Sequence, residues 1–149
     1  MSEPTLSFPG DFRWGTGTSS YQVEGNLTNN DWHAAEQLGG FISGNQHAGC
    51  ACDWWNRAEE DFDRMVALNQ NAHRLSIEWS RVEPSPGVWD EDALARYREM
   101  LQGLLQRGIE PMVTLHHFTN PLWLVEQGGW ENEQVVAWFE RYTRKVVFA

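Results

Sequence analysis

The sequence predicts an α/β fold in which parallel strands alternate with crossover helices, amounting to about three βα units. Short apolar runs alternate along the chain with segments whose apolar residues recur every three or four positions. This alternation is typical of parallel sheets. With 41% hydrophobic and 21% charged residues, the 149-residue chain has a globular composition. A complete β/α barrel needs roughly 250 residues. An open doubly wound sheet and the first part of a barrel therefore both fit these elements.

The first half of the chain contains two predicted strands and one helix. The first strand covers residues 12–16, and a Gly- and Asn-rich loop follows from about 25 to 52. Asp53 is expected to cap a helix that runs to about residue 69. Its apolar face consists of Trp55, Ala58, Phe62, Met65 and Val66. The second strand covers residues 72–79.

The second half repeats this pattern. Asp90 is expected to cap a helix that ends at Gly108, and its apolar stripe is Leu94, Tyr97, Leu101, Leu104 and Leu105. The third strand covers residues 109–115. A last helix is expected from Asn132 through Val147, with four residues facing inward: Val135, Val136, Phe139 and Val146.

The charge and the termini exclude several classes of protein. Eleven basic against 21 acidic residues give a net charge of −10, which disfavours binding to nucleic acid or to an anionic membrane surface. No apolar run is long enough to span a membrane, and the first residues do not resemble a secretory signal. We therefore expect a cytoplasmic protein. The nine tryptophans suit cores, interfaces and sugar binding alike.

Ligands of parallel α/β folds meet the carboxyl ends of the strands, which draws attention to a few polar residues there. Gln22 follows the first strand, and its amide suits sugar hydroxyls, although the commoner role of such an amide is to bind the loop backbone. His116 and His117 follow the third strand, and since neighbouring residues face opposite sides, only one can face a site. Arg74 lies within the second strand and requires a partner, either a local acid such as Glu78 or an acid from a later part of the chain.

Two other interpretations have weak support. The glycine-rich run 15–18 lacks the Lys-Ser/Thr of a phosphate loop, which disfavours a phosphate-binding protein. His47, Cys50 and Cys52 lack a fourth zinc ligand, and two cysteines one residue apart are too close for a comfortable disulfide. We therefore expect no metal site.

Several segments resemble glycoside hydrolase family 1, the β-glucosidase family. They include FPGDFRWGTGTSSYQVEG, ACDWWNRAEEDFDRMVALN and HRLSIEWSRVEPSPGVWDEDALARYREMLQGLLQRGIEPMVTLHHFTNPLWL, followed by QGGW and the last helix. The resemblance covers essentially the whole chain. It implies the N-terminal part of a single (β/α)8 TIM barrel domain, with no second domain within residues 1–149. It also implies a retaining β-glycosidase that hydrolyses terminal β-glycosidic bonds.

The resemblance also implies roles for single residues. Gln22 and His117 match the residues that bind hydroxyls of the non-reducing sugar. Arg74 matches the arginine that holds the nucleophilic carboxylate and favours its ionised form. Phe118 departs from the tryptophan that many members carry before Asp-Leu-Pro, which places the substrate preference in question.

The largest departure from the family is the absence of both catalytic glutamates. Neither the Asn-Glu-Pro motif nor the Glu-Asn-Gly-like motif of the family occurs in these residues. We therefore assign no catalytic role within this chain and expect it to be inactive alone. It is also expected to be unstable alone, because its sheet edges are unpaired. The implied substrate is a β-glycoside or oligosaccharide, no cofactor is needed, and the missing C-terminal part of the barrel is the implied partner. The alternative is a non-catalytic sugar-binding or scaffold chain, or one half of a split enzyme.

Overall fold

The computed structural model describes residues 6–149, which contain one sheet of three parallel strands in the order β1-β2-β3. The strands are β1 (Gly15–Gly17), β2 (Ala72–Ser76) and β3 (Glu110–Thr114). Gly15 pairs with Ala72, which pairs with Glu110 on its other side. The parallel order confirms the predicted α/β class.

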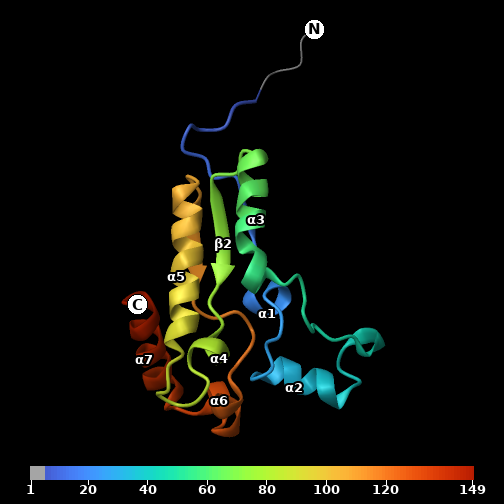
Figure 1. The fold of residues 1–149 in the computed structure, drawn as a ribbon. Coiled ribbons are helices and arrows are strands. Elements are labelled where there is room, and N and C mark those ends of the chain that lie inside the picture. Colours follow the sequence, from blue (N-terminus) through green and yellow to red (C-terminus); the bar gives the residue numbers. More distant parts are fainter. Residues whose placement is uncertain (1–5) are drawn as a thin grey trace.

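Crossover helices join the strands and cover one face of the sheet. Figure 1 shows α3 and α5 running beside β2, while α1, α4 and α6 lie near the carboxyl end of this strand. The helical segments are α1 (Ser20–Val23), α2 (Asp31–Leu38), η1 (Ser43–Asn45), α3 (Trp54–Ala67), α4 (Trp79–Val82), α5 (Glu91–Gln106), α6 (Leu122–Glu126), η2 (Gly129–Glu131) and α7 (Val135–Val147). None of the helices in residues 6–149 has the length and apolar character that a bilayer crossing requires.

The two faces of the sheet differ in burial. His73 and Leu75 of β2 are buried, and the His73 ring lies 5.9 Å from the Trp54 ring of α3. Arg74 points to the opposite face because side chains alternate along a strand. Its pairing partner on β3, Met112, is 65% exposed. One face is thus packed under helices and the other is open, as expected for the inner face of an incomplete barrel.

The core lies between the sheet and the helices. Tyr142 of α7 stacks on Trp79 of α4 with ring centroids 4.8 Å apart, and both side chains are buried. The other core residues include Phe62, Leu75, Ile77, Leu94, Tyr97, Met100, Leu104, Ile109 and Leu124. Burial of these side chains fixes α3, α5 and α7 against the strands and sets the positions of the loops at the carboxyl end.

The first two strands are shorter than predicted. β1 begins at Gly15 rather than residue 12, because the Asn71 side chain binds Phe12 O and Trp14 N ahead of the ladder. β2 ends at Ser76 rather than residue 79. The carbonyl oxygen of Glu78 accepts hydrogen bonds from the amides of residues 81 and 82, which turns the chain into α4.

The predicted loop 25–52 contains two helical segments, α2 and η1, so its irregular character was overestimated. Asn30 precedes α2 and its side-chain oxygen accepts a hydrogen bond from the backbone amide of His33. This is an ordinary N-cap, whose signal was hidden among the surrounding glycines and asparagines. The short helix α6 was also not predicted.

The predicted helix ends are partly correct. Asp90 caps α5 by accepting from Ala93 N, and Gly108 follows the helix with a φ of 72°. Both features confirm the prediction. Asp53 precedes α3, but its side chain binds the Asn56 amide instead of a backbone amide. The last helix starts three residues after Asn132.

Three residues expected on buried faces are exposed: Val66, Leu105 and Val136. In α3 the buried stripe consists of Trp54, Ala58, Phe62 and Met65, which lies one position before Val66. The centres of the predicted faces were therefore correct, but each face extended one position too far on one side, because periodicity identifies a stripe more reliably than its edges.

Candidate active site

A small hollow lies at the carboxyl end of the sheet, where segments from three parts of the chain meet. Gln22 comes from α1, Trp32 from α2, and His117 with Phe118 from the segment after β3. The lining consists of Ser19, Tyr21, Gln22, Trp32, His117, Phe118 and Thr119. The structure thus brings together Gln22 and His117, for which the resemblance implied sugar binding, and Phe118, the position that bears on substrate preference.

Gln22 is exposed at the hollow and keeps part of its hydrogen-bonding capacity. Its side-chain oxygen accepts a hydrogen bond from Ser19 Oγ at 2.5 Å. The side-chain amide nitrogen donates no hydrogen bond within residues 6–149. The amide therefore anchors the turn with its oxygen and still offers two N–H donors to a ligand.

Arg74 and His117 form a contact on the open face of the sheet. The guanidinium Nη2 lies 2.9 Å from His117 Nδ1, and Nε donates to Thr114 Oγ1 at 2.8 Å. Since arginine is only a donor, Nδ1 must accept, and the imidazole proton lies on Nε2. Partial burial, together with the charge of Arg74 and the neighbouring His116, lowers the pKa of His117. His117 is therefore a neutral ring whose Nε2–H can donate to a ligand.

Arg74 has no carboxylate partner among the described residues. Its third contact is the carbonyl oxygen of Thr18 at 3.4 Å. Glu78, the local acid considered as a partner, binds Ser20 and other hydroxyl groups instead. The local alternative is therefore wrong for Glu78, and Arg74 binds Thr114, Thr18 and His117 in residues 6–149.

Aromatic side chains form one wall of the hollow. Phe118 is 64% exposed, has a φ of 66°, and its ring centroid lies 4.7 Å from His117 and 5.9 Å from Trp32. Trp32 was missed because it lies in α2, where a loop was predicted. Aromatic faces of this kind suit the C–H surfaces of a sugar ring. His116 points elsewhere, toward Asn120 and Trp130.

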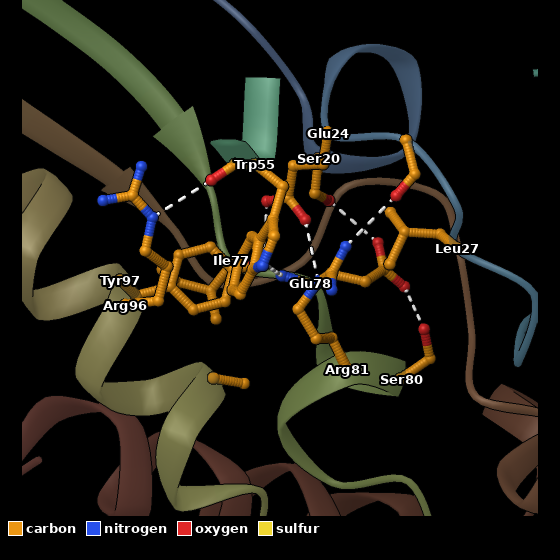
Figure 2. A network of polar contacts seen from close by, with 12 residues as sticks. Ser20, Glu24, Leu27, Trp55, Ile77, Glu78, Ser80, Arg81, Arg96 and Tyr97 are labelled. Atoms are coloured by element: carbon orange, nitrogen blue, oxygen red, sulfur yellow. Dashed lines mark hydrogen bonds and ion pairs between the residues drawn. The ribbon is translucent and has the colours of Figure 1, made fainter. Parts of the chain in front are cut away.

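Figure 2 shows a buried polar network that includes Ser20, whose neighbours in sequence, Ser19 and Tyr21, line the hollow. Glu78 Oε2 accepts from Ser20 Oγ at 2.8 Å, while Glu24 accepts from Tyr97 Oη at 2.7 Å and pairs with Arg81 at 3.1 Å. Burial raises the pKa of Glu24 to about 7, although Arg81 and Tyr97 oppose this shift. Burial likewise raises the pKa of Glu78. Neither carboxylate lines the hollow.

The weaker sequence interpretations find no structural support in residues 6–149. No group of three or more His, Cys, Asp or Glu residues is placed to hold a metal ion. Cys50 and Cys52 are exposed, free thiols. The glycines of β1 serve strand pairing: a Cβ on Gly15 would lie 2.3 Å from the carbonyl oxygen of Ala72. Only glycine permits this close approach.

Comparison with known proteins places this geometry in a family. The family model described as "Glycosyl hydrolase family 1" matches residues 5–149. Beta-glucosidase A of Thermotoga maritima is 35% identical over 143 residues, covering 92% of this chain and 32% of the relative. A beta-glucosidase of Agrobacterium sp. is 35% identical over 156 residues, covering 99% of this chain and 34% of the relative.

Solved structures that resemble this chain include β-glycosidases as well. A beta-glycosidase from Pyrococcus horikoshii is 46% identical and has a TM-score of 0.88. The match covers 95% of this chain and 33% of the Pyrococcus horikoshii chain. A family 1 β-glucosidase from Thermotoga maritima is 34% identical with a TM-score of 0.90, over 93% of this chain and 33% of its own. The chain thus spans about a third of the proteins that it matches and corresponds to the N-terminal part of their TIM barrel. It belongs to glycosyl hydrolase family 1.

Proposed function

We propose that the full-length protein containing this chain is a retaining β-glycosidase of the β-glucosidase type, which hydrolyses terminal β-glycosidic bonds. The chain contributes side chains that bind the non-reducing sugar. The amide of Gln22 and the Nε2–H of His117 donate hydrogen bonds to hydroxyls of the non-reducing sugar. Phe118 packs against the ring, which limits where the sugar can move.

Arg74 acts on the nucleophile and does not contact the sugar. Its guanidinium supports a carboxylate nucleophile supplied by the remainder of the barrel and favours the ionised form of that carboxylate. Retention requires two carboxyl groups about 5–5.5 Å apart, one as nucleophile and one as acid/base. No residue of this chain is assigned either role. The observation that carries the proposal is the half-buried Arg74, which has no carboxylate partner among residues 6–149 and contacts His117, a residue that lines the hollow together with Gln22.

The proposal is tested with 4-nitrophenyl β-D-glucoside. We expect the full-length protein to release nitrophenol with net retention at the anomeric carbon, detected by NMR of the first-formed anomer. Arg74→Lys keeps the charge but not the planar fork, and we expect it to lower kcat/KM by about 10²-fold. Absence of turnover on any β-glycoside, or inversion at the anomeric carbon, would contradict the proposal.

The 149-residue chain alone is expected to give no turnover above buffer, because it lacks both carboxylates. Turnover that Gln22→Ala abolishes would refute this. The second candidate function is sugar binding without catalysis, by a scaffold chain or by half of a split enzyme. The exposed Trp32, which lines the hollow together with Gln22, favours sugar binding. Saturable quenching of Trp fluorescence by a β-glucoside in a full-length protein that shows no hydrolysis would identify it.

A further inference from the structure

Glu78 occupies an unusual position between the two segments that carry the sugar-binding residues. It follows β2, is 1% exposed, and its Oε2 accepts hydrogen bonds from both Ser20 Oγ and Thr119 Oγ1, each at 2.8 Å. Its other oxygen accepts from Ser80 Oγ at 2.6 Å. Figure 2 shows the carboxylate between Ser20 and Ser80. One oxygen atom therefore joins a segment before β2 to a segment after β3.

Each of these hydroxyl groups lies close to a residue of the hollow. Ser20 begins α1, two residues before Gln22 in the same short helix. Thr119 lies two residues after His117, and its backbone amide donates to the His117 carbonyl at 2.9 Å. A shift of Ser20 relative to Thr119 would therefore change the separation of Gln22 and His117 directly.

A carboxylate suits this position for a chemical reason. Three hydroxyl donors converge on Glu78, and an ionised carboxylate accepts hydrogen bonds at both oxygens without donating any. No cation pairs with Glu78 within the described residues. A buried charge without a cation is costly and depends on complete hydrogen bonding. The three hydroxyl contacts meet that requirement.

Other links between the segments lie on either side of Glu78. Arg74 contacts the Thr18 carbonyl and His117 on the open face of the sheet. Asp31 of α2 accepts from the backbone amide and the side-chain amide of Asn120 farther out. Neither link holds α1 itself. Ser76 of β2 also binds Ser20, because its Oγ accepts from the Ser20 backbone amide at 2.7 Å and donates to Ser20 Oγ at 3.1 Å. Of these two contacts of Ser20, only Glu78 also binds Thr119.

We propose that Glu78 is a positioning residue for glycoside hydrolysis, which sets the distance between Gln22 and His117 by holding Ser20 and Thr119 on one carboxylate oxygen. This inference rests on the proposed function. Glu78 does not touch the sugar and is not a catalytic residue. Its position determines whether Gln22 and His117 can donate hydrogen bonds to the same sugar ring.

The test compares Glu78→Gln with a matched control in the full-length protein. The control is Glu83, which is as buried as Glu78. Its carboxylate binds Trp79 Nε1, the Gly87 amide and Arg141, and it contacts neither sugar-binding segment. Both variants remove one buried carboxylate. The probe is castanospermine, which is bound in a solved β-glucosidase from Thermotoga maritima. We expect Glu78→Gln to weaken its binding, measured by calorimetry, by about tenfold, which corresponds to the loss of one hydrogen bond. We expect Glu83→Gln to lower the melting temperature and leave that affinity within about twofold.

A double-mutant cycle with Ser20→Ala separates positioning from a general loss of structure. Ser20 Oγ contacts Glu78 at 2.8 Å and Ser76 Oγ at 3.1 Å, and only Glu78 connects it to Thr119. The double variant should therefore bind castanospermine no more weakly than Glu78→Gln alone. The changes in castanospermine binding free energy caused by Ser20→Ala and Glu83→Gln should instead add. If Glu78→Gln does not fold, Ser20→Ala by itself must weaken binding while the fold is retained.

Two results would overturn the proposal. One is an unchanged affinity in Glu78→Gln or in Ser20→Ala. The other is an equal loss of affinity in Glu83→Gln, which would indicate a structural effect. Failure of the proposed function is distinguishable from both, because the unmodified full-length protein would then neither bind castanospermine nor hydrolyse a β-glucoside.

Discussion

Replacement of Gly15 by alanine tests how β1 positions the sugar-binding segment. A Cβ at this position would lie 2.3 Å from the carbonyl oxygen of Ala72, whereas an ordinary carbon–oxygen contact is about 3.3 Å. The strands must therefore separate by roughly 1 Å, and overpacking of this kind costs about 1–3 kcal/mol. The same separation moves Thr18 and α1 away from Arg74.

Gly17→Ala is the matched control, since a Cβ there would lie 3.6 Å from Arg74 side-chain atoms, an ordinary contact. It belongs to the same strand and should be neutral or slightly stabilising, by about 0.4–1 kcal/mol. Urea unfolding of the full-length protein, followed by Trp fluorescence, measures both variants. Castanospermine affinity should fall only in Gly15→Ala. The reasoning is refuted if the two variants have the same urea midpoint and the same affinity.

Two further predictions concern buried polar groups. Because burial raises the pKa of Glu24 from 4.5 to about 7, stability from its neutral form is complete below pH 4.5 and is lost as pH rises through 7. The unfolding free energy should fall by about 2.5 kcal/mol from pH 5 to pH 8, and the Glu24→Gln variant should show no such fall. An equal change in both proteins would mean that Glu24 stays ionised beside Arg81 at both pH values. Tyr142 Oη donates to the Leu115 carbonyl at 2.8 Å, so Tyr142→Phe should lower the unfolding free energy by about 1–2 kcal/mol. An unchanged value in denaturant titration would show that the hydroxyl contributes nothing.

The order of strands and helices could be predicted because burial imposes a period on each segment. The cap at Asp90 and the glycine at 108 are local features, and both were identified correctly. Strand ends were less accurate, because side-chain bonds from Asn71 and backbone bonds to Glu78 end the ladders. The contacts of Asn71 join residues that are distant in sequence, so they have no local signature. The turn at Glu78 is local, but it interrupts an apolar run that predicts a continuous strand.

The site could be predicted only in part. Gln22, Arg74 and His117 follow or lie within strands, so topology places them at one end of the sheet. Trp32 was missed because glycines and asparagines surround its helix. Glu78 drew attention as an acid near the site, but its contacts with hydroxyl groups depend on the packing of three segments. No sequence spacing encodes that arrangement.

The most direct test of the account is a crystal structure of the full-length protein with castanospermine, which is bound in a solved β-glucosidase from Thermotoga maritima. We predict that Gln22 and His117 donate hydrogen bonds to hydroxyls of the same ring. Arg74 should contact a carboxylate that lies outside the present residues. A ligand bound away from the hollow, or held by only one of these two side chains, would contradict the account.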